Sequence, residues 1–589
     1  MFTKHLPLVL TISILCAIGS TQASGVGPHR SRSTNVAHPW NMWLGATGGP
    51  FNAPSSPDNW LGGAGNWSNS ADWSAGLPGS SSDVTINTGS DNVTLDTSPS
   101  INSLVLGGAT GRSQLTDNGN PHMLTIAGAL TVNQSGYLYL PSGDTMTAGA
   151  SSANLGNIDL EFSSSLQVNG DLNNSGGICL GCAFFNQSYG NVLAATGTLT
   201  NSGSIALGFY FQDGMKAGGG SLTAGKLVNT GSIGLSGMSY GTIMGSLVNE
   251  GSIGLGAGGN AFYVYGDATN SGSISTGGVH SGDVLSIAGK LTNTATGILN
   301  LEGSNGAGSE ASVGFLTNAG TILVGSPVPT QYLVVTGGSH AAPNALPGFL
   351  NTGIVNISLG GALTSVPNYV QTSGQTIVDG RLLMVGNAIA NFAGGAVYGN
   401  GGTIYGAVVS NAAINIGDSP MTIGQLFMMG NYTQGANGSL TFDIAGAAAG
   451  QYDQLNVSGK AKFNGLMTVN LLNGFVPQIG DMFDIMNFAG GSGTFSKVLG
   501  LPINSQEHFM LEYNPTNLTL DVVPGQDTNI GDAWSSISAS AITWVPGNGV
   551  YQGMSSNGVS DPTPEPSSIL LVGSGLLGIA AVLRRKRSI

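Results

Sequence analysis

The sequence predicts an all-β fold, a right-handed parallel β-helix (β-solenoid), followed by a single C-terminal transmembrane helix. A short motif built on Asn-x-Gly recurs through the middle of the chain at intervals of 20 to 33 residues. Charged residues make up only 7% of the chain, against about a quarter in ordinary globular proteins. An apolar run followed by four basic residues stands at the C-terminal end. The elements below follow in chain order.

Residues 1–23 have the pattern of a secretory signal peptide. Lys4 and His5 precede an apolar stretch over positions 6–18, and Thr21-Gln22-Ala23 provides a small-residue cleavage site. We therefore expect an exported protein and leave this segment out of the fold. One of the three cysteines belongs to it, so the body keeps Cys179 and Cys182.

Residues 24–105 are predicted to form a Trp-rich N-terminal cap and the first coils. Five of the seven Trp residues fall here: Trp40, Trp43, Trp60, Trp67 and Trp73. Because an open solenoid end is an exposed sheet edge, we expect these aromatics to cover it. The alternative is that exposed indole rings stack on carbohydrate. The stretch from 65 to 86, with its Asn-Trp and Asp-Trp pairs, resembles the opening of many exported autotransporter-like β-helix proteins.

Residues 106–429 carry the β-helix repeats. The motif Leu/Phe-x-Asn-x-Gly-x-Ile, in complete or looser form, is centred on seven asparagines: Asn201, Asn229, Asn249, Asn270, Asn293, Asn318 and Asn351. Degenerate copies begin at Asn174 and Asn351. Periods in the twenties with short strands on each side of a turn fit one coil of a parallel β-helix. Separate β-sandwich domains would need a period of about 100 residues, which is not visible.

Each coil must bury its apolar face against the next coil. We expect Leu199, Ile205 and Leu207 to stack on the same motif positions of the following copy, which are Leu227, Ile233 and Leu235. The Asn side chains at equivalent corners should hydrogen-bond along the stack as a ladder. The motif Gly should supply a corner with positive φ.

Residues 430–523 are predicted to form the C-terminal coils. Alternating apolar residues run from Leu440 to Ile485, with a Gly480-Asp481 turn, and Thr516–Val523 is expected to be a closing strand. This stretch is similar to the last coils of autotransporter passenger stalks. Residues 524–563, rich in Gly, Ser and Asn, are predicted to be a linker.

Residues 564–589 have the pattern of a sorting tail. Pro564, Glu565 and Pro566 precede an uncharged apolar run over 567–583, about 25 Å as a helix at roughly 1.5 Å per residue. The basic side chains that follow favour the cytoplasmic side: Arg584, Arg585, Lys586 and Arg587. The tail resembles the PEP-CTERM sorting signal of exopolysaccharide-producing Gram-negative bacteria, which an exosortase-type membrane peptidase handles. The resemblance implies a temporary anchor that is cut near the Pro-Glu-Pro motif; the alternative is a permanent single-span anchor.

The sequence offers little reactive chemistry. Without Lys4 and the four tail cations, 10 basic residues remain against 28 or 29 acidic ones, so the net charge near −19 argues against nucleic acid. Cys179 and Cys182 are expected to form a tight disulfide or a pair of quiet thiols, because no zinc ligands accompany them. No metal or other cofactor is expected. His122, His280, His340 and His508 lie far apart, and eight Lys and Arg residues are scattered between 40 and 560.

These features predict a non-enzymatic protein of the cell surface or extracellular matrix. Its expected partners are an exosortase-type peptidase, membrane lipid around the C-terminal helix, and exopolysaccharide. The alternative is a β-helix that binds or cleaves exopolysaccharide, which for cleavage requires two carboxyl groups within about 10 Å in a groove. An adhesin or ice binder is disfavoured, because Thr-x-Thr spacings do not repeat.

Overall fold

A computed structural model describes most of the predicted body. The described residues are 55–182, 188–209, 218–277, 282–303, 308–325, 331–337 and 348–525. The predicted signal peptide, nearly all of the linker, and the predicted transmembrane helix at 567–583 lie outside them. Within the described ranges, no helix has the length and apolar character needed to cross a membrane.

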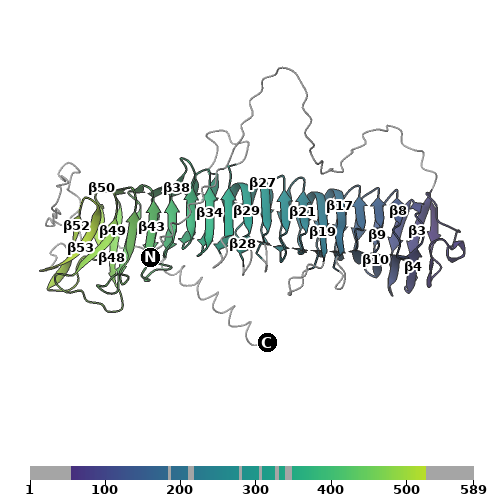
Figure 1. Cartoon of the computed structure of the whole chain (residues 1–589), viewed down its shortest axis with the longest axis horizontal. Helices are drawn as coiled ribbons and strands as arrows, with labels where there is room; N and C mark the ends of the chain where they lie inside the picture. The colour runs from purple at the N-terminus through teal and green to yellow at the C-terminus, as the bar shows by residue number, and fades with distance from the viewer. Residues whose placement is uncertain are drawn as a thin grey trace, which may run out of the picture. The chain divides into compact units, whose positions relative to one another are not determined.

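The body is a coil with three short strands in each turn. One turn consists of β21 (Tyr240–Ile243), β22 (Leu247–Asn249) and β23 (Ser252–Leu255), and the next of β24 (Ala261–Val264), β25 (Ala268–Asn270) and β26 (Ser273–Ser275). Each strand pairs in parallel with its counterpart in the next turn. We call the three stacks of strands the first, second and third face, in that order. Figure 1 shows the turns following one another from purple β3 to yellow β53.

The three faces extend over nearly the whole described body. Their first strands are β5 (Ser100–Ile101), β1 (Ser56–Asn59) and β2 (Ala64–Asn66), and their last parallel strands are β49 (Met482–Asn487), β50 (Gly490–Gly493) and β51 (Lys497–Leu499). The third face contains 19 strands. Apart from the short 3-10 helix η1 (Ser70–Asp72), the described residues contain no helix. The predicted all-β parallel solenoid is therefore confirmed.

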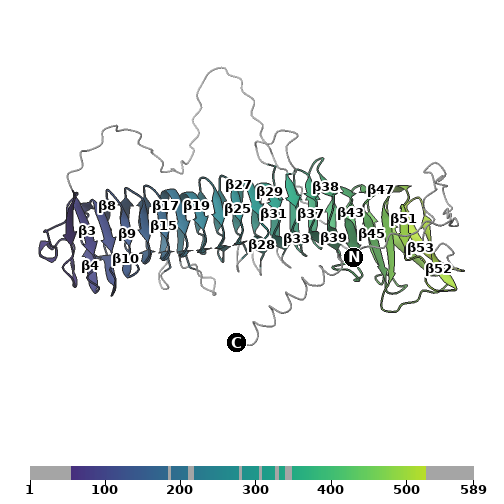
Figure 2. The same ribbon diagram turned by 180° about the vertical axis from the view of Figure 1, so that it is seen from behind.

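Four long strands join the first two faces. They are β17 (Ser188–Asn201), β19 (Gly218–Asn229), β27 (Val284–Asn293) and β29 (Glu310–Asn318). Their pairings shift register where the chain turns the corner between the faces. In these turns the strand continues around a corner that other turns interrupt with a short loop. The view from behind shows β17 and β19 side by side in the stack (Figure 2).

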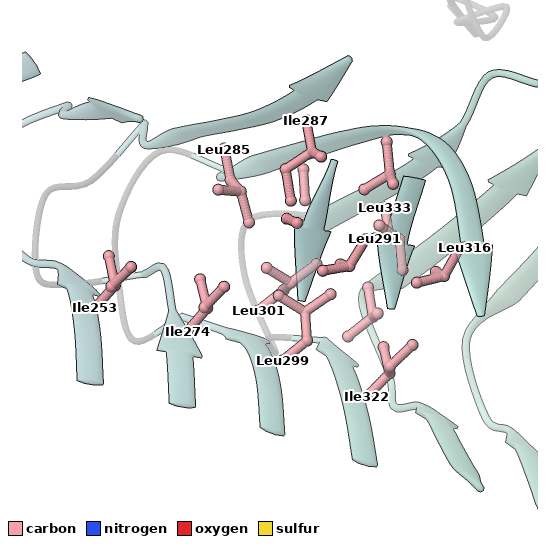
Figure 3. Close-up of a cluster of buried hydrophobic side chains, with 14 of the residues drawn as sticks. Ile253, Ile274, Leu285, Ile287, Leu291, Leu299, Leu301, Leu316, Ile322 and Leu333 are labelled. Atoms are coloured by element: carbon pink, nitrogen blue, oxygen red, sulfur yellow. The ribbon is translucent and has the colours of Figure 1, made fainter. Parts of the chain in front are cut away.

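The core is a continuous row of apolar side chains inside the coil. The third-face column Ile253, Ile274, Leu299 and Ile322 points toward side chains from the other two faces, such as Leu285 and Leu291 (Figure 3). All are at most 1% exposed, and each Å² of buried apolar surface contributes about 25 cal/mol. The predicted stacking is confirmed by the register, which pairs Leu199 with Leu227, Ile205 with Ile233, and Leu207 with Leu235.

The motif asparagines form the expected ladder at the ends of the second-face strands in the middle turns. Eight side-chain bonds of 2.7–2.8 Å join nine buried residues, with each Nδ2 donating to the Oδ1 of the next turn. The members of this Asn ladder are Asn154, Asn174, Asn201, Asn229, Asn249, Asn270, Asn293, Asn318 and Asn351. The same Nδ2 groups also donate to backbone carbonyls at the corner, for example from Asn249 to Gly251 and Ser273. The ladder therefore satisfies buried polar groups that no side chain of the core would otherwise reach.

The predicted role of the motif glycine is wrong. Gly203, Gly231, Gly251 and Gly272 do not have positive φ. A Cβ on Gly251 would instead lie less than 3.0 Å from the carbonyl oxygen of Gly231 in the preceding turn, and the other three show the same conflict. That oxygen accepts the N–H of Ser252 at 2.9 Å. Glycine is needed here because two backbones approach closely, and not because of its backbone conformation.

Both ends of the described coil are covered. At the N-terminal end Trp60, Trp67 and Trp73 are at most 3% exposed and pack with ring centroids 4.9–5.0 Å apart. Because these three rings are buried, their faces are not available to a sugar; Trp40 and Trp43 lie outside the described residues. At the other end, β52 (Glu507–Tyr513) and β53 (Asn517–Pro524) form an antiparallel hairpin that pairs with β49. The expected closing strand is present.

Candidate functional site

A shallow hollow lies on the outer side of the third face. It occupies about 580 Å³ beside β7 (Ser113–Asp117), β10 (Gly136–Leu140) and β13 (Asn157–Leu160). Its lining consists of Gly108, Ala109, Thr110, Gly111, Arg112, Gln134, Ser135, Gly136, Tyr137 and Asn157. This volume lies within the usual range of small-ligand sites, about 300–1,000 Å³.

Two tyrosines project outward from β10. Leu138 and Leu140 point into the core and are at most 1% exposed, so the alternation of the strand places Tyr137 and Tyr139 on the outer side. Their rings stack with centroids 5.8 Å apart and planes inclined by 12°. The pair forms a fixed aromatic edge at the hollow.

Arg112 lies over this edge. Its guanidinium carbon is 3.9 Å from the centre of the Tyr137 ring, within the range of a cation–π contact. The guanidinium N–H groups meet no acceptor among the residues that the structure describes. Stacking uses the face of the guanidinium and leaves its N–H edge free for a ligand.

Asp159 fixes the other side of Tyr137. The Tyr137 hydroxyl donates a hydrogen bond to the Asp159 carboxylate. Burial raises the pKa of Asp159, while the hydrogen bond from Tyr137 and the charge of Arg112 lower it. Burial, followed by the bond and charge of Asp159, raises the pKa of Tyr137, so the hydroxyl remains a donor at neutral pH.

This arrangement suits binding. The lining offers one cation, two side-chain amides and two small hydroxyls, and it includes no carboxyl group. Cleavage of a glycosidic bond usually requires a pair of carboxyl groups on either side of that bond.

Two carboxyl pairs are buried in the described body, Asp117 with Asp144 and Asp443 with Asp453. Asp144, 1% exposed, has its pKa raised to about 7, first by burial and then by the hydrogen bond and charge of Asp117. Asp453, also 1% exposed, has its pKa raised to about 8, mainly by burial, with the charge of Asp443 adding to it. Both accept backbone N–H groups, Asp144 from His122 and Asp453 from Gly424 and Asp443. Neither pair lines the hollow. The fold brings each pair together, and neither pair is evident from the sequence pattern.

The two cysteines lie beside the hollow. Cys179 of β16 (Gly177–Leu180) pairs in register with Asp159, and the backbone N–H of Cys182 donates to Glu161 at 2.8 Å. Their Cα atoms are 6.0 Å apart, and the sulfurs are placed as a disulfide. The bond stays a prediction: alkylation without prior reduction should label neither cysteine.

Other residues singled out in the sequence have structural contacts. Lys226 and Lys290 stand at equivalent corners, each just before a second-face strand. Asp481 accepts the N–H of Gln478 in a turn, and Asp484 accepts a bond from Asn517. In the described ranges no three His, Cys, Asp or Glu side chains are grouped to hold a metal.

One comparison with known proteins bears on the tail. Residues 562–586 match the family model of the PEP-CTERM protein-sorting motif. The match contains Pro564, Glu565, Pro566 and three of the four basic residues, all of which lie outside the described residues. No curated protein matches the chain. The protein therefore combines a β-solenoid body with a PEP-CTERM motif, which implies export and sorting by an exosortase at a membrane.

Proposed function

We propose that this chain is a non-enzymatic structural protein of the cell surface or extracellular matrix, released there after an exosortase-type peptidase cuts its tail. The observation that carries the proposal is the match of residues 562–586 to the sorting motif. The apolar run at 567–583 would hold the chain in the membrane, with Arg584–Arg587 on the cytoplasmic side. Cleavage near Pro564–Pro566 would then free the body outside.

The solenoid suits a display role. Its strands are paired turn on turn, and its ends are covered by the Trp cluster and by the antiparallel hairpin. The ends of the described coil therefore offer few free strand edges for edge-to-edge association. With only 7% charged residues, the chain presents few ionic groups to its surroundings.

The sorting role of the tail is tested by changing Pro564, Glu565 and Pro566 to Ala in cells that contain the peptidase. The wild-type chain should reach the envelope or the medium, whereas the triple variant should stay in the inner membrane. Pro546→Ala, a change in the predicted linker, is the matched control and should behave as wild type. Equal distribution of the triple variant and the wild type would reject sorting through this motif.

A second candidate function, carbohydrate binding, is favoured by the hollow around Arg112 and Tyr137. In this case the β-solenoid body would bind glycan in the matrix in addition to its structural role. It requires no cofactor and no cleavage of the sugar chain.

A further inference from the structure

We propose that the hollow on the third face binds a sugar residue that carries a carboxylate, set in an otherwise neutral glycan. The site consists of Arg112, Gln134, Tyr137 and Asn157, at the outer surface of β7, β10 and β13. The inference does not depend on processing of the tail, because it concerns only side chains of the described body.

Arg112 is prepared to receive an anion. The guanidinium is held on the Tyr137 ring, which is itself fixed by Tyr139 and by the Asp159 carboxylate. Holding the planar fork in place before binding reduces the entropy that is lost when a ligand docks. A carboxylate is the partner that matches this fork, with two parallel N–H···O bonds.

The wall of the hollow is also fixed. The Ser135 hydroxyl accepts the N–H of Gly108 at 2.9 Å and donates to the carbonyl of the same residue at 2.8 Å. Asn133 donates to Gly107 at 2.8 Å. These bonds attach the loop before β7 to the next turn, so the shape of the hollow exists before a ligand arrives.

The remaining lining matches sugar hydroxyls. The side-chain amides of Gln134 and Asn157 are exposed, and neither has a hydrogen-bond partner among the described residues. Each amide offers both donors and acceptors, which is what a ring of hydroxyl groups requires.

The negative net charge of the protein limits how many acidic groups the bound glycan can carry. The chain has a formal net charge of −14, so a densely charged polyanion is repelled by the molecule as a whole. Arg112 is the single cation of the lining, and the field of Asp159 partly offsets it. One carboxylate can be accommodated, and binding of a single sugar should be weak, in the millimolar range.

The test compares methyl β-D-glucuronide with methyl β-D-glucoside, which differ only at C6. Each is titrated against the full chain and followed by saturation-transfer NMR. The wild type should bind the glucuronide about tenfold more tightly, as a charge-assisted bond to Arg112 predicts. Arg112→Gln should remove this preference, and Asn157→Leu should weaken both sugars alike.

Lys226→Gln, an exposed cation at another corner, is the control and should keep the preference. Circular dichroism of each variant shows whether the solenoid remains intact. Equal affinity for the two sugars, no binding of either in the millimolar range, or a preference that survives in an intact Arg112→Gln would overturn the proposal.

Discussion

One column of the second face is filled in three different ways along the described coil. In its middle turns the column is the Asn ladder, from Asn154 to Asn351. In the turns before it, the same position holds Ile86, Leu106 and Val132, and in the turns after it Gln371, Phe392 and Ser410. The same backbone coil therefore accepts an apolar column, an amide ladder or a mixed column.

The Asn ladder is less well hydrogen-bonded at its two ends than in its middle. Asn154, the first member of the ladder, faces Val132, and its Oδ1 atom is buried without a hydrogen-bond partner. At the other end Asn351 reaches the Gln371 Oε1 atom at 3.3 Å, longer than the bonds within the ladder, and this oxygen also accepts the Thr376 hydroxyl. A buried amide in this column is well satisfied when both of its neighbours are amides. The free-energy cost of burying polar atoms is concentrated at the two ends of the ladder.

The largest effect is expected from breaking the ladder in its middle. Asn249→Leu leaves the Oδ1 of Asn270 without its side-chain donor and removes the Oδ1 that accepts from Asn229. Each buried polar group left unpaired costs about 1–3 kcal/mol, so we expect a loss of about 3 kcal/mol. Asn154→Leu, at the junction with Val132, should cost about 1 kcal/mol. Denaturant unfolding measures both; equal losses would show that the ladder does not act as a unit.

A smaller effect is expected from the glycines. Gly251→Ala places a Cβ against the carbonyl oxygen of Gly231, and we expect a loss of about 2 kcal/mol as the turns are forced apart. Gly234→Ala is the matched control, because a Cβ there meets nothing within 4 Å. It should change the stability by less than about 0.5 kcal/mol. If both variants unfold alike, close backbone approach is not the reason for the motif glycine.

A further effect concerns the dependence of stability on pH. Asp144 and Asp453 hold protons in the folded state up to about pH 7 and 8, whereas the ordinary pKa is 3.8. The folded chain therefore binds more protons than the unfolded chain above pH 4, and stability falls as pH rises to about 8. The thermal midpoint should fall by a few degrees over this window. Asp144→Asn should reduce the fall of the thermal midpoint in the lower part of this pH window. An unchanged fall would contradict the raised pKa of Asp144.

The repeat predicted much of the fold. The Asn-x-Gly spacing indicated the coil, the pairing of Leu199 with Leu227, and the amide ladder, because all three follow from identical residues at a regular interval. The repeat could not show why position 251 is glycine. A positive φ and a close backbone approach both require glycine, so the sequence does not distinguish them.

The hollow was not predicted. Arg112, Tyr137 and Asp159 lie on three successive turns, 22 to 25 residues apart, and no motif links them. Outward positions carry no constraint from the core, so their side chains vary from turn to turn. Only the register of β7, β10 and β13 shows that they meet. Asp117 and Asp144 escaped notice for a similar reason, since burial of a loop corner is not visible in composition.

The most direct test of an exported scaffold released through its tail is the intact mass of the protein recovered from its native cells. We expect a chain that begins after residue 23 and ends before the apolar run, lacking residues 567–589. A recovered protein that is outside the membrane and still carries residues 584–589, or one that keeps its first 23 residues, would contradict it.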